Sequence, residues 1–521
     1  MSRTNLGAAH VISERGLLVA LTDATRPTDA SMNTDLYELT MAQGLWENDK
    51  TEEQGCFTAF FREAPFGNSY AVMCGTAELG EFVENFRFTE EDIAYLSELE
   101  APGGGLLFKS GFLRFLADFR PRVDIDAIPE GELVFAREPM VRVTGPMLDC
   151  QLLETALLNI IIGFQTLVAT KPARVVQAAQ GRPVAEFGLR RAQGPDGGVA
   201  VARASYVAGC ASTSNVLAGR RYGIPVSGTH AHSWVLSFPT ALEAFRAFAK
   251  SSPKNCTLLV DTYDVREGVE NAITVAREME ASGERLSGIR IDSGDLAKLS
   301  AYARRRFDDE GLDYVKIVVS NDLDEHTISS LLGQGAPVDA FGVGTKLATC
   351  YDQPALGCVY KLSARRDSAS EAWTPVMKFS EQPYKRTIPG VQQVRRYVDR
   401  TGSPVCDMIW DESSQPGAGA FGHTLVAVND AALVTDVSGF SFRELLEPVV
   451  REGSAVAPRE NIELARARCA ASLASLDDAY KRFLYPQSYV VGMERGLAAL
   501  RDGLVRERMA ATSSVLPWKA K

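Results

Sequence analysis

The chain has 521 residues, of which 45% are hydrophobic and 23% are charged, and its formal net charge is −11. This length is enough for more than one hydrophobic core. The acidic total argues against a nucleic-acid partner held by bulk charge, although a local basic pocket for phosphates is compatible with it. No apolar run approaches the roughly 18 residues that a membrane-spanning helix needs. We therefore expect neither a nucleic-acid partner nor a membrane.

The cysteines and the N-terminus indicate the cellular compartment. The chain has 9 cysteines, an odd number, and none of them form a Cys-x-x-Cys pair. Reduced thiols in a cytoplasm are the simplest interpretation of that pattern. Residues 1–30 are polar and lack the apolar core and the cleavage site of a secretion signal. We therefore expect a cytoplasmic protein.

The first half of the chain mixes helical and strand-like patterns. A helix is predicted to begin near Thr34, which can cap it together with Asp35. Strand-like runs follow at 56–61 and 131–143, and residues 149–169 have the pattern of one long apolar helix.

Between about 180 and 345 the pattern becomes regular, with short apolar runs that each end in a polar or glycine-rich cluster. The runs lie at 184–188, 224–230, 258–261, 288–292, 317–321 and 341–345. The last four recur about every 25–30 residues, the length of a strand, loop and helix unit. A (β/α) barrel and a doubly wound parallel sheet would both give this repeat. Polar residues at nearly every run end favour the barrel, because an open sheet would need them only at its switch point.

The repeat stops after Lys361, where strand-like and turn-like segments return before a largely helical stretch at 461–506. We therefore predict an α/β protein, a (β/α) barrel plus an α+β domain built from N-terminal and later segments. The predicted parts are a flexible extension at 1–30, an N-terminal α+β domain at 31–150 completed by about 360–430, a barrel catalytic domain at 151–360, and a mostly helical C-terminal region at 431–521.

The stretch GTHAHSWVL at 228–236 places two histidines, His230 and His232, one residue apart. In a strand, side chains two apart point to the same side, so this is also the spacing of a metal site. The chain has 5 histidines in total, and His10, His326 and His423 lie outside the run ends where further ligands would be needed. We therefore predict that His230 and His232 are not metal ligands, and we assign no residue as a ligand of a resident metal ion.

A reacting histidine is the better hypothesis for this stretch. A neutral imidazole is a good nucleophile toward phosphorus and carbon, and a carboxylate behind it can set its tautomer. Glu186, at the end of an earlier run, is our candidate for that carboxylate. The alternative for either histidine is an ordinary hydrogen-bonded loop residue.

The stretch GIRIDSGD at 288–295 is the second dense cluster of polar residues. Arg290 and Asp292 fall on one face of a strand. A guanidinium forks onto a carboxylate and stacks on rings, so Arg290 can clamp a planar anionic substrate. Asp292 and Asp295 can hold Mg²⁺ or a ribose hydroxyl, and the alternative is an internal salt bridge.

Two neighbouring run ends have the composition of a phosphate site. Gly342, Gly344 and Thr345 end one run, and glycines let backbone N–H groups approach phosphate oxygens. Ser320 and Asn321 end the preceding run and add donors. No Gly-x-x-x-x-Gly-Lys-Ser/Thr loop is present. The residues alone predict a barrel enzyme acting on a phosphorylated anionic small molecule, with a reactive histidine and an arginine clamp.

These motifs, with others spread over most of the chain, resemble those of the nicotinate phosphoribosyltransferase family. The matching stretches are TDLYELTMA at 34–42, EFGLRRAQGPDGG at 186–198, SNVLAG at 214–219, GTHAHSW at 228–234, the Arg290 cluster, VSN at 319–321, GVGT at 342–345, KFS at 378–380 and TIPG at 387–390. The family fold, an incomplete (β/α) barrel with an N-terminal domain completed by later segments, agrees with the organisation predicted above.

The resemblance implies a reaction. Nicotinate and 5-phosphoribosyl 1-pyrophosphate give nicotinate mononucleotide and pyrophosphate in NAD salvage, coupled to hydrolysis of the co-substrate ATP through a phosphohistidine. It implies that ATP transiently phosphorylates His232 and that His230 is a local variation. Mg²⁺ would accompany phosphoribosyl pyrophosphate and ATP and neutralise the leaving group.

The resemblance also assigns residues to nicotinate. Tyr37 is similar to the aromatic residue that packs on the nicotinate ring, which the partner subunit supplies in family homodimers. Thr229 and Arg290 match positions that hold nicotinate, and Arg290 is suited to its carboxylate. With His232 and Asp292, Arg290 forms the predicted catalytic group.

The remaining assignments concern the phosphoribosyl group. Thr345, with Gly342 and Gly344, matches the position that holds its 5-phosphate, and Ser320 and Asn321 are expected to bind substrate beside it.

Three rival functions stay open at this point. A nicotinamide phosphoribosyltransferase would need a group that holds a neutral amide, and a quinolinate-type relative would need more basic residues for two carboxylates. A non-catalytic nucleotide binder would not need His232, Arg290 and Asp292 together.

Overall fold

The chain forms two compact units in the computed structural model, which describes residues 31–513 except 368–369, 371, 381, 383–384, 415–421 and 457. Unit 1 comprises Met1–Thr166 and Leu356–Lys521, and unit 2 comprises Leu167–Ala355. The barrel predicted over 151–360 overlaps unit 2 in most of its residues. The predicted extension at 1–30 lies outside the described residues.

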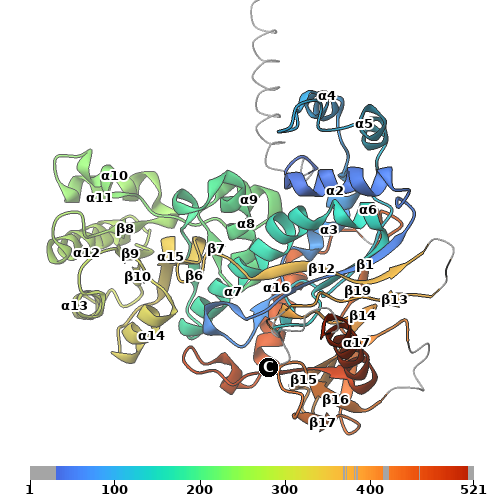
Figure 1. Cartoon of the computed structure of the whole chain (residues 1–521). Coiled ribbons are helices and arrows are strands. Elements are labelled where there is room, and N and C mark those ends of the chain that lie inside the picture. Colours follow the sequence, from blue (N-terminus) through green and yellow to red (C-terminus); the bar gives the residue numbers. More distant parts are fainter. Residues whose placement is uncertain are drawn as a thin grey trace, which may run out of the picture. The chain divides into compact units, whose positions relative to one another are not determined.

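Unit 2 is built on a sheet of six parallel strands in the order β7-β6-β11-β10-β9-β8 (Figure 1). The strands are β6 Val184–Glu186, β7 Ser212–Thr213, β8 Thr257–Leu259, β9 Gly288–Ile291, β10 Lys316–Val319 and β11 Ala340–Val343. Within the described part of unit 2 the end strands β7 and β8 are not paired with each other, so the barrel is incomplete. The predicted α/β class with an incomplete barrel is confirmed.

Helices alternate with these strands and begin at the carboxyl edge of the sheet. They are α8 Gly194–Val207, α9 Val216–Tyr222, α10 His232–Leu236, α11 Ala241–Ser251, α12 Val265–Ala281, α13 Leu296–Asp309, α14 Glu325–Gly333 and α15 Thr345–Ala348. Asp264, Asp295 and Asp324 cap α12, α13 and α14 by accepting backbone N–H groups of the first turn. The caps fix where each helix starts, and so position the loops at the strand ends.

One face of the two inner strands β9 and β10 is apolar and buried, because residues two apart in a strand lie on the same face. Ile289, Ile291, Ile317 and Val319 are fully buried. One predicted strand is wrong: in the run at 224–230 only Val226 pairs, through an isolated bridge to Thr213. The physical reason is Pro225, which has no N–H for a sheet ladder.

The larger sheet of unit 1 joins early and late segments of the chain. Its seven strands have the order β13-β12-β1-β5-β3-β19-β20. They are β1 Gln54–Phe61, β3 Asp124–Ala127, β5 Val141–Pro146, β12 Cys358–Arg366, β13 Thr374–Pro375, β19 Glu447–Arg451 and β20 Ser454–Ala455. Of the segments at about 360–430 predicted to complete the N-terminal α+β domain, β12 and β13 lie in this sheet, whereas β19 and β20 come from beyond that range.

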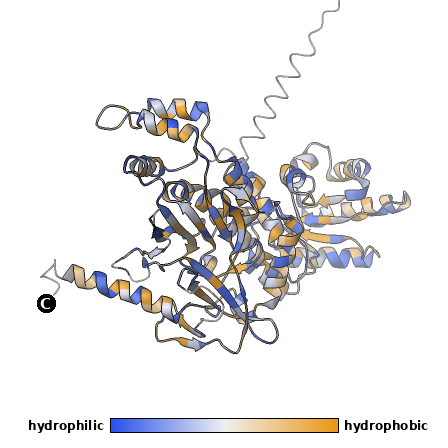
Figure 2. Cartoon of the chain, turned by 90° about the vertical axis from the view of Figure 1, so that its right-hand side faces the viewer, coloured by the Kyte–Doolittle hydropathy of each residue, from blue (hydrophilic) through white to orange (hydrophobic). Residues whose placement is uncertain are grey.

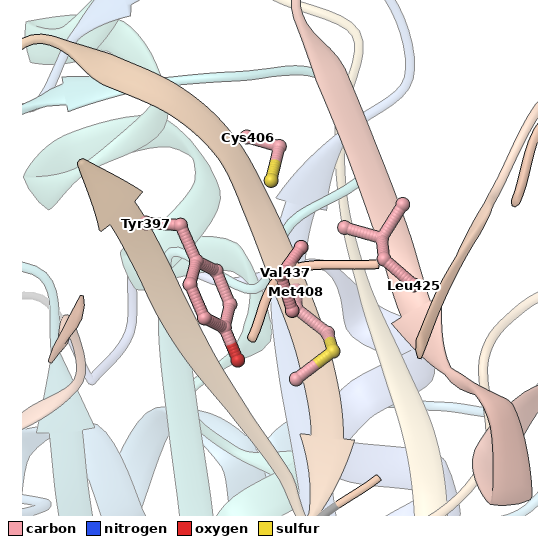
Figure 3. Close-up of a cluster of buried hydrophobic side chains, with 5 residues drawn as sticks. All are labelled: Tyr397, Cys406, Met408, Leu425 and Val437. Atoms are coloured by element: carbon pink, nitrogen blue, oxygen red, sulfur yellow. The ribbon is translucent and has the colours of Figure 1, made fainter. Parts of the chain in front are cut away.

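A second sheet of unit 1 comes entirely from the C-terminal part of the chain, in the order β17-β16-β21-β15-β14-β18. Its strands are β14 Gln392–Val398, β15 Pro404–Asp411, β16 Thr424–Ala427, β17 Val434–Asp436, β18 Ser441–Glu444 and β21 Val490–Glu494. Tyr397, Cys406, Met408, Leu425 and Val437 form the buried cluster that Figure 3 shows between these strands.

The prediction of a mostly helical region at 431–521 is therefore wrong for its first part. Helices α16 Ile462–Ser475 and α17 Arg495–Ser513 are present, but β17 to β20 precede them and β21 lies between them. The residues of β17 and β18 are mostly exposed, so the chain there shows little of the apolar alternation that predicts a strand. Figure 2 shows hydrophilic and hydrophobic residues interspersed along α17, the helix at the lower left.

The other helices of unit 1 are α2 Leu36–Glu47, α3 Leu79–Asn85, α4 Glu90–Glu98, α5 Ser110–Ala117 and α6 Met147–Gln151, and β2 Ala71–Val72 pairs with β4 Leu133–Val134. The single helix predicted at 149–169 is instead three segments, because a π-helical turn at Ala156–Ile161 separates α6 from α7 Gly163–Ala178. Across 147–178 the described chain is long and apolar enough to cross a membrane, which corrects our expectation of no such run. In its most apolar window 71% is buried inside the molecule, as in the core helix of a globular domain.

Candidate functional site

Polar side chains meet at the carboxyl ends of β8, β9 and β10, three neighbouring strands of unit 2. Asp261 follows β8, Asp292 follows β9 and Ser320 follows β10. Carboxyl ends of parallel strands share one edge of a sheet, which is where α/β proteins bind ligands. Two of these three residues, Asp292 and Ser320, were predicted from the sequence.

Arg290 is the centre of this edge. Its Nε donates to Ser320 Oγ at 3.0 Å, its Nη1 donates to Thr229 Oγ1 at 2.7 Å, and its Nη2 lies 3.2 Å from Asp292 Oδ2. The Arg290 side chain is only 15% exposed, and its guanidinium carbon lies 6.0 Å from the centre of the Phe187 ring. The structure thus brings Thr229, Arg290, Asp292 and Ser320 together, and a planar cation faces an aromatic ring.

Two carboxylates are tied together next to Arg290. Asp261 Oδ2 accepts the backbone N–H of Asp292 at 3.1 Å and the hydroxyl of Ser293 at 2.6 Å. Asp261 Oδ1 is buried and has no hydrogen-bond partner in the described chain. A buried carboxylate oxygen normally has a partner, so this atom is suited to a ligand that supplies positive charge or a donor.

His232 is the first residue of α10 and lies beside the same carboxylates. Its Nδ1 is 3.1 Å from Thr262 Oγ1, and its Nε2 is 3.9 Å from Asp292 Oδ2. Its side chain is 44% exposed. Nδ1 thus has a hydroxyl partner, while Nε2 is accessible. An imidazole held in this way can react through Nε2.

His230 has a different environment from His232. It is buried, and its Nε2 accepts the backbone N–H of Leu259 at 3.1 Å. Burial is the main cause that lowers the pKa of His230, so the ring is neutral. Because Nε2 is occupied by the β8 backbone, His230 is a structural residue that joins its loop to the sheet.

Glu186 is not the carboxylate behind His232, and our prediction of that role is wrong. Its side chain is buried and accepts the hydroxyl of Thr213 at 2.6 Å and the backbone N–H of Gly188. Burial raises the pKa of Glu186, while those two hydrogen bonds oppose the rise. The carboxylate instead holds the loop after β6.

The predicted phosphate loop follows β11 at the same edge of the sheet. Gly342 lies against the Phe187 ring, and a Cβ at that position would come within 2.7 Å of two ring carbons. Gly344 precedes α15, whose first residue is Thr345. Asn321, after β10, has a φ of 95°, a left-handed conformation that asparagine tolerates better than most residues.

Two predicted residues lie elsewhere or do other work. Tyr37 lies on α2 in unit 1, and its side chain is 43% exposed. Burial and the nearby charges of Glu154 and Glu38 raise the pKa of its phenol. Asp295, a candidate for Mg²⁺ or a ribose hydroxyl, uses Oδ1 to cap α13 through the Lys298 N–H at 3.1 Å.

Sequence reasoning missed three residues at this edge: Phe187, Asp261 and Thr262. Asp261 is a polar residue at the end of an apolar run, so the strand-end argument that selected Asp292 would also have selected it, whereas the apolar Phe187 does not meet that criterion. Thr262 gives no signal by itself, because its importance comes only from its distance to His232.

Matches to known proteins agree with this geometry. Three family models cover most of the chain: the nicotinate phosphoribosyltransferase N-terminal domain at 32–162, the nicotinate phosphoribosyltransferase family at 183–400, and the C-terminal domain at 391–501. A nicotinate phosphoribosyltransferase of Bacillus subtilis is 44% identical over 71% of this chain and 74% of its own length. A human nicotinate phosphoribosyltransferase is 34% identical over 90% of this chain and 96% of its own length.

Solved structures give the same result. The crystal structure of human nicotinic acid phosphoribosyltransferase covers 91% of this chain and 99% of its own, with a TM-score of 0.76 and 31% identity. A nicotinate-nucleotide pyrophosphorylase from Pyrococcus furiosus has a TM-score of 0.65 at 20% identity, which supports the fold alone. The fold is that of a phosphoribosyltransferase. The chain belongs to the nicotinate phosphoribosyltransferase family.

Proposed function

We propose that this chain is a nicotinate phosphoribosyltransferase that forms nicotinate mononucleotide and pyrophosphate from nicotinate and phosphoribosyl pyrophosphate, in NAD salvage. The observation that carries the proposal is the guanidinium of Arg290, held by Thr229, Ser320 and Asp292 beside the ring of Phe187. A planar aromatic carboxylate fits these groups, because the guanidinium recognises the carboxylate and the Phe187 ring packs against the pyridine.

The transfer step needs an oriented ring and a stabilised leaving group. The pyridine nitrogen attacks the anomeric carbon of the ribose while the bond to pyrophosphate breaks, through a cationic ribosyl centre. No proton moves in this displacement. The work of the residues is therefore to orient nicotinate through its carboxylate, and to hold the 5-phosphate at the loop of Gly342, Gly344 and Thr345.

Asp261 and Asp292 are suited to Mg²⁺. Mg²⁺ binds proteins through one or two carboxylates and completes its shell with water and substrate phosphates, and Asp261 Oδ1 lacks a partner among the described residues. Nowhere in the described part of the chain do three or more His, Cys, Asp or Glu side chains surround one metal position. When bound with the substrate, the ion would neutralise the pyrophosphate leaving group.

We assign the coupling to ATP to His232. With Nδ1–H donated to Thr262, the lone pair of Nε2 can attack the γ-phosphorus of ATP; ADP leaves, and water later cleaves the N–P bond to release phosphate. The 3.9 Å between His232 Nε2 and Asp292 Oδ2 would make the charge of a phosphohistidine felt at Asp292 and hence at Arg290.

Product formation tests the proposal. Wild type should form nicotinate mononucleotide with Mg²⁺, and ATP should raise the yield; His232→Ala should keep its fold and lose the ATP effect. With ATP labelled at the γ-phosphate, acid-labile label should appear in wild type and in His230→Gln, the matched control, and be absent from His232→Ala. If the wild type forms no mononucleotide, the proposed function is rejected. If the label persists in His232→Ala, the assignment of His232 as the phosphorylated residue is rejected.

We further propose a homodimer in which Tyr37 of one chain serves the other chain's site. Leu36, Tyr37 and Met41 on α2 are 53%, 43% and 47% exposed, which supports a covered face there. Tyr37→Ala and Arg290→Ala should each be inactive alone. Mixed after separate purification and allowed to exchange, they should regain up to about a quarter of wild-type activity, because half of the dimers carry one intact site of two. No recovery despite proven exchange would reject the shared site.

A cytoplasmic location is our remaining proposal. The described residues include all 9 cysteines, 8 of them buried, and none is in a disulfide, which is typical of a reducing compartment. The location of a tagged chain in fractionated cells would test it.

A further inference from the structure

Lys346 is the second residue of α15 and follows the predicted phosphate loop directly. Its Nζ forms an ion pair with Asp324 Oδ2 at 2.6 Å, and the lysine side chain is 28% exposed. Asp324 caps α14, the helix after the neighbouring strand β10. The ammonium group is thus at the site's edge of the sheet, between the loops that follow β10 and β11.

The Asp324 carboxylate keeps a partner without the lysine. Its Oδ1 accepts the backbone N–H of Thr327 at 2.7 Å, which is the capping bond of α14, and only Oδ2 is used by Lys346. These bonds hold the pKa of Asp324 at about 2 despite an opposing effect of burial. Loss of the lysine would leave a buried carboxylate that still accepts the Thr327 N–H.

Lys346 differs in this respect from the other lysine of the region. Lys171 is completely buried and is bound to Glu325 at 2.7 Å and to Asp352, so it cannot leave its partners without exposing buried charge. The charges of Asp324, Asp352 and Asp322 face Lys346 and raise its pKa. Unlike Lys171, Lys346 is only half-buried and lies next to Thr345, so its ammonium can exchange a carboxylate partner for another anion.

We propose that Lys346 is the cation of the 5-phosphate subsite, and that its ion pair with Asp324 is the resting state, which the phosphate of the substrate exchanges for a phosphate–lysine pair. A phosphate dianion attracts the ammonium more strongly than a single carboxylate does, and Asp324 keeps its capping bond after the exchange. This inference rests on the proposed function, because it takes phosphoribosyl pyrophosphate as the substrate.

The test compares three substitutions. Lys346→Met should raise KM for phosphoribosyl pyrophosphate about tenfold or more, with KM for nicotinate within about twofold, and Lys346→Arg should restore most of the loss. Asp324→Asn keeps a capping side chain and frees the lysine, so KM for phosphoribosyl pyrophosphate should stay the same or fall. Lys316→Met is the matched control: it removes an exposed lysine paired with Asp339 at 3.3 Å, at the opposite end of β10.

A purely structural ion pair predicts a different result, namely that Asp324→Asn and Lys346→Met raise both KM values alike. That outcome, or an unchanged KM in Lys346→Met, would overturn the inference. Calorimetry with ribose 5-phosphate tests the role of Lys346 independently of the proposed function. If wild type and Lys316→Met bind ribose 5-phosphate and Lys346→Met does not, the role of Lys346 is supported even if no transfer occurs. Ribose 5-phosphate binding that is equal in wild type and Lys346→Met would reject it even in an active enzyme.

Discussion

The strand-end cluster of unit 2 (Thr229, His232, Arg290, Asp292, Ser320) and the buried ion cluster of unit 1 (Glu132, Glu138, Arg396, Asp407) are built from similar groups but differ in exposure. Each centres on one arginine bound to carboxylates. Arg290 and Asp292 keep 15% and 24% of their side chains exposed, whereas Arg396 and Asp407 keep 2% and 0%.

The partners of the two arginines differ as well. Arg396 Nη2 lies 2.7 Å from Asp407 Oδ2 and its Nη1 lies 3.4 Å from Glu132, and Tyr489 donates to Asp407 at 3.0 Å. Burial, and then the charge of Asp407, raise the pKa of Glu138 well above its usual range. Every partner of Arg396 is therefore part of the fold. Arg290 instead has hydroxyl partners that can exchange for a ligand, so exposure, more than residue type, separates a binding arginine from a structural one.

The largest effect should come from breaking the buried cluster. Arg396→Met leaves Asp407 buried without its cation, so the free energy of unfolding should fall by about 3–5 kcal/mol. Arg443→Met removes an arginine, 46% exposed, that also pairs with Glu132 at 2.8 Å, and should cost below about 1 kcal/mol. Urea unfolding of both variants measures the difference; equal losses would contradict the contrast between the two clusters.

The strand-end cluster should respond in activity instead. Arg290→Gln should lower kcat/KM for nicotinate by about 100-fold, the range of a charge-assisted hydrogen-bond pair, with a change in unfolding free energy below about 1 kcal/mol. The matched control, Arg246→Gln, removes an exposed arginine that pairs with Glu278 at 2.6 Å and should leave both quantities unchanged. If Arg290→Gln loses as much unfolding free energy as Arg396→Met, the contrast between a binding arginine and a structural arginine is wrong.

The smallest effect concerns His230 and sharpens the comparison within unit 2. Burial is the main cause that lowers the pKa of His230, so the unfolded chain takes up a proton at a higher pH than the folded one. The contribution of the His230 ring to stability is complete above the unfolded pKa of about 6.5 and is lost as the pH falls from that value through the lower pKa of the folded state. His230→Gln keeps an acceptor for the Leu259 N–H and does not titrate. The loss of unfolding free energy between pH 7.5 and 5.5 should therefore be smaller in this variant than in wild type, and an equal loss in both would refute the assignment.

Much of the candidate site was predictable because a strand end is recognisable in the sequence as a polar residue that follows a short apolar run. Arg290, Asp292 and Ser320 were selected as polar residues that end apolar runs, and the parallel sheet brings those ends to one edge. Glu186 also ends an apolar run, but its predicted role was wrong. Its hydrogen bonds to Thr213 and Gly188 cannot be predicted from the local sequence. Thr262 could not be found at all, since only the fold brings its hydroxyl to His232.

The sequence by itself determined the class of fold, the family and the set of polar residues at the strand ends, because apolar periodicity and motif order are local properties of the chain. It did not determine which of those residues are available to a ligand. Tertiary structure decided that His230 is bound to the β8 backbone while His232 is exposed, that residues 434–455 form strands, and that Asp261 keeps one oxygen without a partner. The physical reason is that burial and hydrogen-bond partners depend on segments far apart in sequence, which only the folded chain brings together.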